Sequence, residues 1–208
     1  MQTTLNKIKS HSPCGLLEPE NTNLGWGKLL NYLGKNQSDD EVLELRTILE
    51  SNGIKDTLWA FRAVQGKDKE IRLFAADCAE MVLPIYEKEY PNDYRPRNAI
   101  HAARDYANGL ISAGELVVAR ADASAAADAA MTKWAASSAK WAAVSAAWDA
   151  ASAASAADAA VAAQRAAADA ALAAQRADAS AAADAGITAK EAADAAWNEI
   201  KCLLLKYI

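Results

Sequence analysis

The chain has 208 residues, a formal net charge of −5 and 52% apolar residues, a length that allows one sizeable domain or two small ones. The acidic balance argues against a nucleic-acid-binding protein, because such proteins are usually basic. Three cysteines without close spacing argue against a disulfide framework, so a reducing cytosol is expected. The sequence contains no charge-free apolar run long enough for a membrane span and no apolar stretch typical of a signal peptide.

The first third of the chain predicts short helices that end at glycines. The first covers residues 24–33 and ends at Gly34. The second begins at Ser38 or Asp39, where a side-chain oxygen can cap it, and ends before Gly53. A third spans residues 55–65. The apolar side chains of the second helix recur at the spacing of a buried face: Val42, Leu45, Ile48 and Leu49.

A longer helix is predicted over residues 68–90, and its apolar residues recur at the three-to-four spacing of a buried stripe. We expect Phe74, on this stripe, and Trp59, before it, to be buried in the core of the first half. Pro84 lies inside the helix and removes a backbone donor, so a kink is expected near residues 80–81.

An alanine-rich tract makes up most of the second half. Ser112 and Glu115 have the spacing of a capping box that opens it, and neither glycine nor proline occurs again before Gly186. A single straight helix would change its buried face midway, so we expect a break near residues 151–155 and two alanine-rich helices packed antiparallel. The large residues that indicate this change are Trp134, Trp141 and Trp148 on one side and Val161 and Leu172 away from it.

A final helix is predicted after a second capping box, formed by Thr188 and Glu191. Because alanine buries little area, this helix is expected to pack on the large side chains of the first half. The sequence therefore predicts an all-α fold, a helical bundle in which long alanine-rich helices pack against a half built of shorter helices. The expected regions are residues 1–110 and 111–208, packed as one unit, and close alanine faces also suggest a homo-oligomer.

Residues that could support catalysis or metal binding are sparse. His11 and Cys14 could be two metal ligands, but no second pair lies near them in the sequence, and structural zinc needs four. No phosphate-binding loop and no Ser/His/Asp arrangement is visible, so the protein is expected to be no enzyme and to need no cofactor or metal. The aspartates of the alanine tract are interpreted as solvating its helices: Asp122, Asp128, Asp149, Asp158, Asp169, Asp178 and Asp184.

Two groups of residues are candidates for binding a partner or ligand. The three tryptophans spaced by seven form a core stripe or a surface that stacks on a partner: Trp134, Trp141 and Trp148. The charged residues at the turn near residue 93 either cap and pair locally or bind an anionic partner: Asp93, Arg95, Arg97 and Arg104. Carboxylates on the preceding helix could occupy the arginines instead: Asp77, Glu80 and Glu87.

One segment carries a family resemblance. It contains Cys78-Ala-Glu80, Tyr90-Pro91, Arg95-Pro-Arg97 and Ala-Ala-Arg104 in this order, and His-Ser-Pro-Cys14 precedes it near the start of the chain. In these motifs the chain resembles the fifth immunity-protein family of polymorphic toxin systems, whose relatives also occur in phages.

The resemblance implies a non-catalytic inhibitor in the cytoplasm of a bacterial host cell. Such a protein would neutralise a toxin or a bacterial defence effector by stoichiometric binding. One alternative is a phage counter-defence protein that sequesters a small signalling nucleotide, and another is a structural helical oligomer. The resemblance supplies no catalytic residues.

Overall fold

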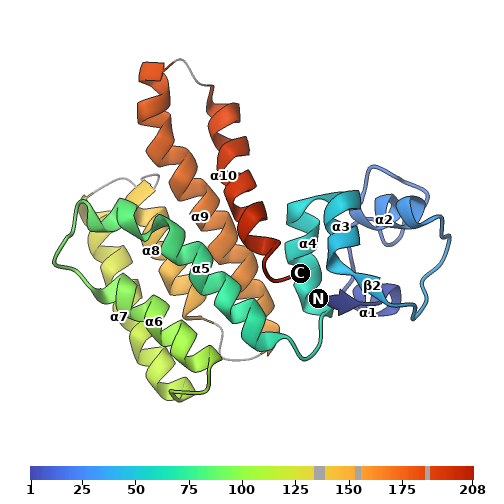
Figure 1. The fold of residues 1–208 in the computed structure, drawn as a ribbon, viewed down its shortest axis with the longest axis horizontal. Helices are drawn as coiled ribbons and strands as arrows, with labels where there is room; N and C mark the ends of the chain where they lie inside the picture. Colours follow the sequence, from blue (N-terminus) through green and yellow to red (C-terminus); the bar gives the residue numbers. More distant parts are fainter. Residues whose placement is uncertain (134–138, 153–155, 186–187) are drawn as a thin grey trace. The chain divides into compact units, whose positions relative to one another are not determined.

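The computed structural model describes residues 1–133, 139–152, 156–185 and 188–208. They form two compact units, Met1–Lys67 with Leu205–Ile208 and Asp68–Leu204. Almost all regular structure is helical, which confirms the all-α prediction (Figure 1). The sequence predicted regions at residues 1–110 and 111–208 that pack as one unit, and this division stays a prediction. Within the described ranges, no helix has the length and apolar character that crossing a membrane requires.

The first unit is built of short helices and one small sheet. The helices are α1 (Leu5–Ser10), α2 (Gly25–Leu33), α3 (Leu45–Asn52), α4 (Ile54–Ala60) and the 3-10 turn η1 (Phe61–Ala63). Strands β1 (Gln2–Thr3) and β2 (Leu43–Glu44) pair antiparallel, with Gln2 opposite Glu44. The large side chains of the core come from all these helices: Leu5, Ile8, Trp26, Leu29, Leu45, Ile48, Leu58 and Phe61.

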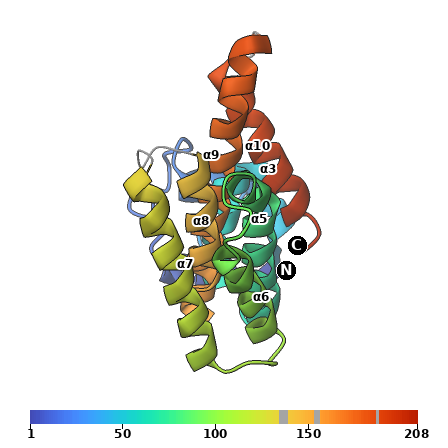
Figure 2. The ribbon, with the colours of Figure 1, turned by 90° about the vertical axis from the view of Figure 1, so that its left-hand side faces the viewer.

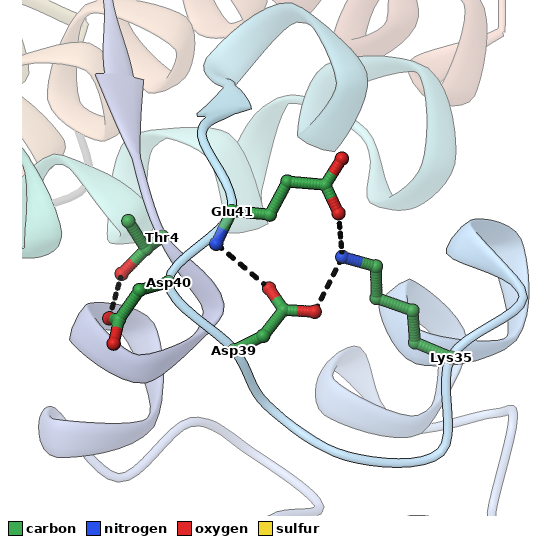
Figure 3. A network of polar contacts seen from close by, with 5 residues as sticks. All are labelled: Thr4, Lys35, Asp39, Asp40 and Glu41. Carbon is green, nitrogen blue, oxygen red and sulfur yellow. Dashed lines mark hydrogen bonds and ion pairs between the residues drawn. The ribbon is translucent and has the colours of Figure 1, made fainter.

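The prediction of a helix from Ser38 or Asp39 is wrong, because residues 38–42 form a loop before β2. Figure 3 shows why: the Asp39 carboxylate accepts from the Glu41 backbone N–H at 3.1 Å and from Lys35 Nζ at 2.6 Å. Lys35 also binds the Glu41 carboxylate at 2.6 Å. These local bonds stabilise a turn at the expense of a helical start. Val42, expected on a buried face, is therefore 63% exposed.

Trp59 in α4 is only partly buried, which contradicts the expectation of a core position. Its ring lies beneath the Arg62 guanidinium, 5.3 Å from the ring centroid. The tightly packed residues of α4 are instead its neighbours Leu58 and Ala60. A partly exposed indole ring with a cation over its face is a cation–π arrangement that is common at protein surfaces.

The second unit is a bundle centred on α5 (Asp68–Glu87). Helix α5 packs against α6 (Arg95–Ala107), α8 (Ala139–Ala150), α9 (Ala156–Ala185) and α10 (Ala189–Leu204), while α7 (Ala113–Lys133) packs on α6 and α8 (Figures 1 and 2). Phe74 is fully buried on α5, as predicted. Helix α5 continues as one element past Pro84 to Glu87.

The alanine tract supplies much of this core, which the sequence analysis did not expect. Helices α8 and α9 pack on each other and on α5. Alanine side chains let helix backbones approach closely, so many of them lose all contact with solvent: Ala142, Ala143, Ala146, Ala147, Ala159, Ala163, Ala166, Ala167, Ala170 and Ala173. The prediction of two helices is corrected to three, because α7 lies beside α8 as a separate helix (Figure 2).

The two predicted capping boxes are confirmed. Helix α8 ends at Ala150 and a turn follows at residues 151–152, where the expected break begins. Residues 153–155 of that break and Gly186, the predicted end of the tract, lie outside the described residues. In the first capping box, Ser112 Oγ accepts from the Glu115 N–H at 3.3 Å and the Glu115 carboxylate accepts from the Ser112 N–H at 2.8 Å. The second box repeats this geometry at Thr188 and Glu191.

The last helix does not pack as predicted. We expected α10 to depend on the large side chains of the first half, but its main neighbour is α9 of the alanine tract, with fewer contacts to α5. Ile200 and Leu204 of α10 are fully buried. A surface of small residues accepts large side chains from a neighbouring helix, and burial of those large side chains supplies the stabilisation.

Candidate functional site

The turn before α6 is fixed by a hydrogen-bonded group around Asp93. Arg95 donates to the two Asp93 oxygens, from Nε at 2.8 Å and from NH2 at 2.6 Å, while the Tyr86 hydroxyl donates to Oδ2 at 2.7 Å. The Arg95 guanidinium, helped by the Tyr86 hydroxyl, lowers the pKa of Asp93 to about 2. Burial and the Asp93 charge raise the pKa of Tyr86. Asp93 therefore stays ionised and the arginine stays bound to it.

The other two candidate arginines join α6 to α5. Arg97 forms a bidentate ion pair with Glu87, in which Nε donates to Oε1 at 2.7 Å and NH2 donates to Oε2 at 2.6 Å. Arg104 NH2 binds Asp77 Oδ1 at 2.7 Å and also binds Glu80. Arg104 lowers the pKa of Glu80, and the two carboxylates raise the pKa of Arg104.

These pairs balance the positive charge of the candidate site. Three arginines face four carboxylates, so an anionic partner would meet no excess of positive charge here. The local ion pairing that the sequence left open as an alternative is thus present in the structure. The side chain of Arg97 remains 40% exposed and that of Arg104 25%, so both can still contact a partner. Partner binding by Asp93 and the arginines stays a prediction.

The tryptophan stripe lies largely outside the part of the chain that the structure describes. Trp134 falls between the described ranges, and the side chains of Trp141 and Trp148 are likewise not described, although both residues belong to α8. Neither the core interpretation nor the binding interpretation of the three tryptophans is tested, and both stay predictions.

A polar pocket lies where α7, α8 and α9 meet. Its volume is about 240 Å³. Helix α7 contributes Arg120, the end of α8 contributes Asp149, and α9 contributes Arg165. Asp158, Ser152 and an apolar wall of Val161 and Ala162 complete the lining.

Asp149 is the unusual group in this pocket. Its residue is only 3% exposed, and its Oδ1 atom has no hydrogen-bond partner among the described residues. Burial, followed by the neighbouring carboxylate of Asp169, raises the pKa of Asp149 to about 7, against the opposing effect of Arg165 and Arg120. The Asp169 side chain is hydrogen bonded to Asp149, and Asp149 keeps its proton up to about neutral pH.

The interpretation of the tract's aspartates as solvating groups is therefore wrong for Asp149, although Asp122, Asp128 and Asp158 are exposed as expected. The sequence of α9 carried an indication of this burial. Four of the six charged residues of the helix are separated by seven, four and seven positions and so share one face: Asp158, Arg165, Asp169 and Arg176. The other two are Asp178 and Asp184. Charged residues that only solvate a helix need not share one face, whereas charged residues that contact a neighbouring helix must do so.

Comparisons with known proteins give one match. A family model described as Imm-5 like putative immunity protein matches residues 64–193. No curated protein and no solved structure matches the chain. The matched range contains α5 to α9, the paired arginines of α6 and the polar pocket.

Proposed function

Because the chain belongs to the family of Imm-5 like immunity proteins, we propose that it neutralises a protein toxin by binding it, without catalysing a reaction. The family match over residues 64–193 is the observation that carries this proposal, since it covers more than half of the chain. Stoichiometric inhibition needs a preformed surface of fixed shape. The buried alanine contacts among α5, α8 and α9 are suited to hold such a surface.

The proposed contact surface is the turn before α6 together with the face of that helix that carries Arg97 and Arg104. Tyr94 is 57% exposed there, and the side chains of Arg95 and Arg97, which follow it in the sequence, are 39% and 40% exposed in their ion pairs with Asp93 and Glu87. Tyrosine and arginine are the residues that most often dominate binding energy at interfaces. Guanidinium groups already held by carboxylates lose little further freedom when a partner binds, and they still present N–H donors at their outer edges.

We predict that the double variant Arg97→Ala/Arg104→Ala loses neutralisation while its melting temperature stays near that of the parent protein. The ion pairs are partly exposed, and such pairs contribute little to stability. Neutralisation would be measured as growth of bacteria that co-express this chain and the toxin expected to be encoded beside it.

The matched control is Lys35→Ala, which breaks ion pairs with Asp39 and Glu41 outside the family match. This control should neutralise as well as the parent chain. If the double variant unfolds, the arginines are structural and the site assignment fails. If it remains folded and still neutralises fully, the toxin binds elsewhere.

Two finer assignments belong with this proposal. A defence effector as the target, with the chain encoded by a phage, would use the same binding mode. Self-association also stays a prediction, although its physical reason is weaker than the sequence suggested, because many of the alanine faces of α8 and α9 are already covered within one chain.

A further inference from the structure

The polar pocket between α7, α8 and α9 has the features of a built binding site. Asp149 lines it from the end of α8, is almost wholly buried, and keeps one carboxyl oxygen without a hydrogen-bond partner among the described residues. A buried polar atom left unpaired is costly, so an occupant that donates a hydrogen bond to it is favoured.

Positive charge lies at the same pocket. Arg165 on α9 lines it and is exposed, so its guanidinium can reach a ligand from solvent. Arg120 on α7 adds a second guanidinium to the lining, while Asp158 and the nearby Asp169 supply the opposing negative charge. A ligand that carries a single charge would be attracted by one side of this lining and repelled by the other.

We propose that this pocket binds a small metabolite with an N–H donor at one end and a carboxylate or phosphate at the other. The N–H group donates to Asp149 Oδ1, and the anionic group binds the Arg165 guanidinium. The apolar wall of Val161 and Ala162 packs against the body of the molecule between the two ends. This assignment does not depend on toxin neutralisation.

The size of the pocket restricts the choice of ligand. Its volume of about 240 Å³ is smaller than the roughly 300–1,000 Å³ typical of sites for drug-sized molecules. Two common classes of small molecule combine an N–H donor with an anion at this scale: amino acids and nucleoside monophosphates. They share the chemistry that the pocket recognises, and an experiment can separate them.

Thermal melting of the full chain tests the proposal with two probes. One is a mixture of the twenty amino acids, and the other is a mixture of the four ribonucleoside 5′-monophosphates, with each component at about 1 mM. One mixture should raise the melting temperature by about 5–10 °C if its active component has a dissociation constant of about 10 µM. A rise below about 1 °C with both mixtures would overturn the proposal.

Variants then locate the binding site. Arg165→Gln replaces an exposed side chain, so it should fold normally and weaken binding of the active component about 10- to 100-fold by calorimetry. Asp149→Ala, which removes the acceptor oxygen, should weaken it as well, whereas Asp128→Ala, at an exposed aspartate of α7, should leave it unchanged. An unchanged dissociation constant in the Arg165→Gln variant would place the ligand elsewhere and refute the assignment.

Discussion

Replacing Phe74 with alanine is expected to lower the free energy of unfolding by about 3–5 kcal/mol. The side chain is fully buried on α5, the helix on which α6, α8, α9 and α10 all pack. Its neighbours on the same buried stripe are Ile71, Cys78 and Val82. Two of the helices packed on α5, α8 and α9, are rich in alanine, whose side chain cannot extend into a cavity.

Urea or thermal unfolding measures this effect. For a chain of this length the predicted change corresponds to a fall in melting temperature of about 10 °C. Val118→Ala is the matched control, since Val118 lies on α7 and is 63% exposed, and it should change stability by less than about 0.5 kcal/mol. A loss below about 1 kcal/mol for Phe74→Ala would mean that the buried face of α5 is wrongly assigned.

Substitution of Asp149 by asparagine is expected to stabilise the protein above pH 7. The folded-state pKa of Asp149 is about 7, well above the value of about 3.9 for an unfolded aspartate. The folded protein therefore holds an extra proton between about pH 4 and pH 7, and its stability falls as pH rises through this window. Asparagine cannot ionise, and its amide can still donate to Asp169.

At pH 8 the variant should be more stable than the parent by an amount on the order of a few kcal/mol, and near pH 4 the two should be nearly equal. Asp128→Asn, at an exposed position, should differ little from the parent in stability at either pH. The comparison is made above pH 4 because Asp93, Asp39 and Glu80 have lowered pKa values and cost stability when they become protonated in stronger acid. A less stable Asp149→Asn variant at pH 8 would show that Asp149 is held as a carboxylate by Arg120 and Arg165.

The parts of the fold that local sequence determines were predictable. Both capping boxes depend on residues three positions apart, so Ser112 with Glu115 and Thr188 with Glu191 could be recognised without the rest of the structure. The apolar stripe of α5 around Phe74 is likewise a local periodicity. The pairing of Arg97 and Arg104 with carboxylates of α5 joins two helices, and the sequence offered it as one of two interpretations.

Other misses arise from long-range contacts. The pairing of Gln2 with Glu44 joins strands of two residues each, which are too short to leave a periodic pattern. In the alanine tract most apolar residues are alanine, so hydrophobic periodicity identifies the buried face poorly. The burial of Asp149 follows from the approach of α9 to α8, and only the aligned charges of α9 indicated a polar seam there.

Native mass spectrometry of the chain recovered from its own cells tests directly whether this protein works by binding a toxin. We expect a complex of this 22.0 kDa chain with a second polypeptide in a fixed ratio. Expression of that polypeptide without this chain should arrest growth, and co-expression should restore it. Recovery of the chain with no second polypeptide, or with one whose expression is harmless, would refute toxin binding as the function.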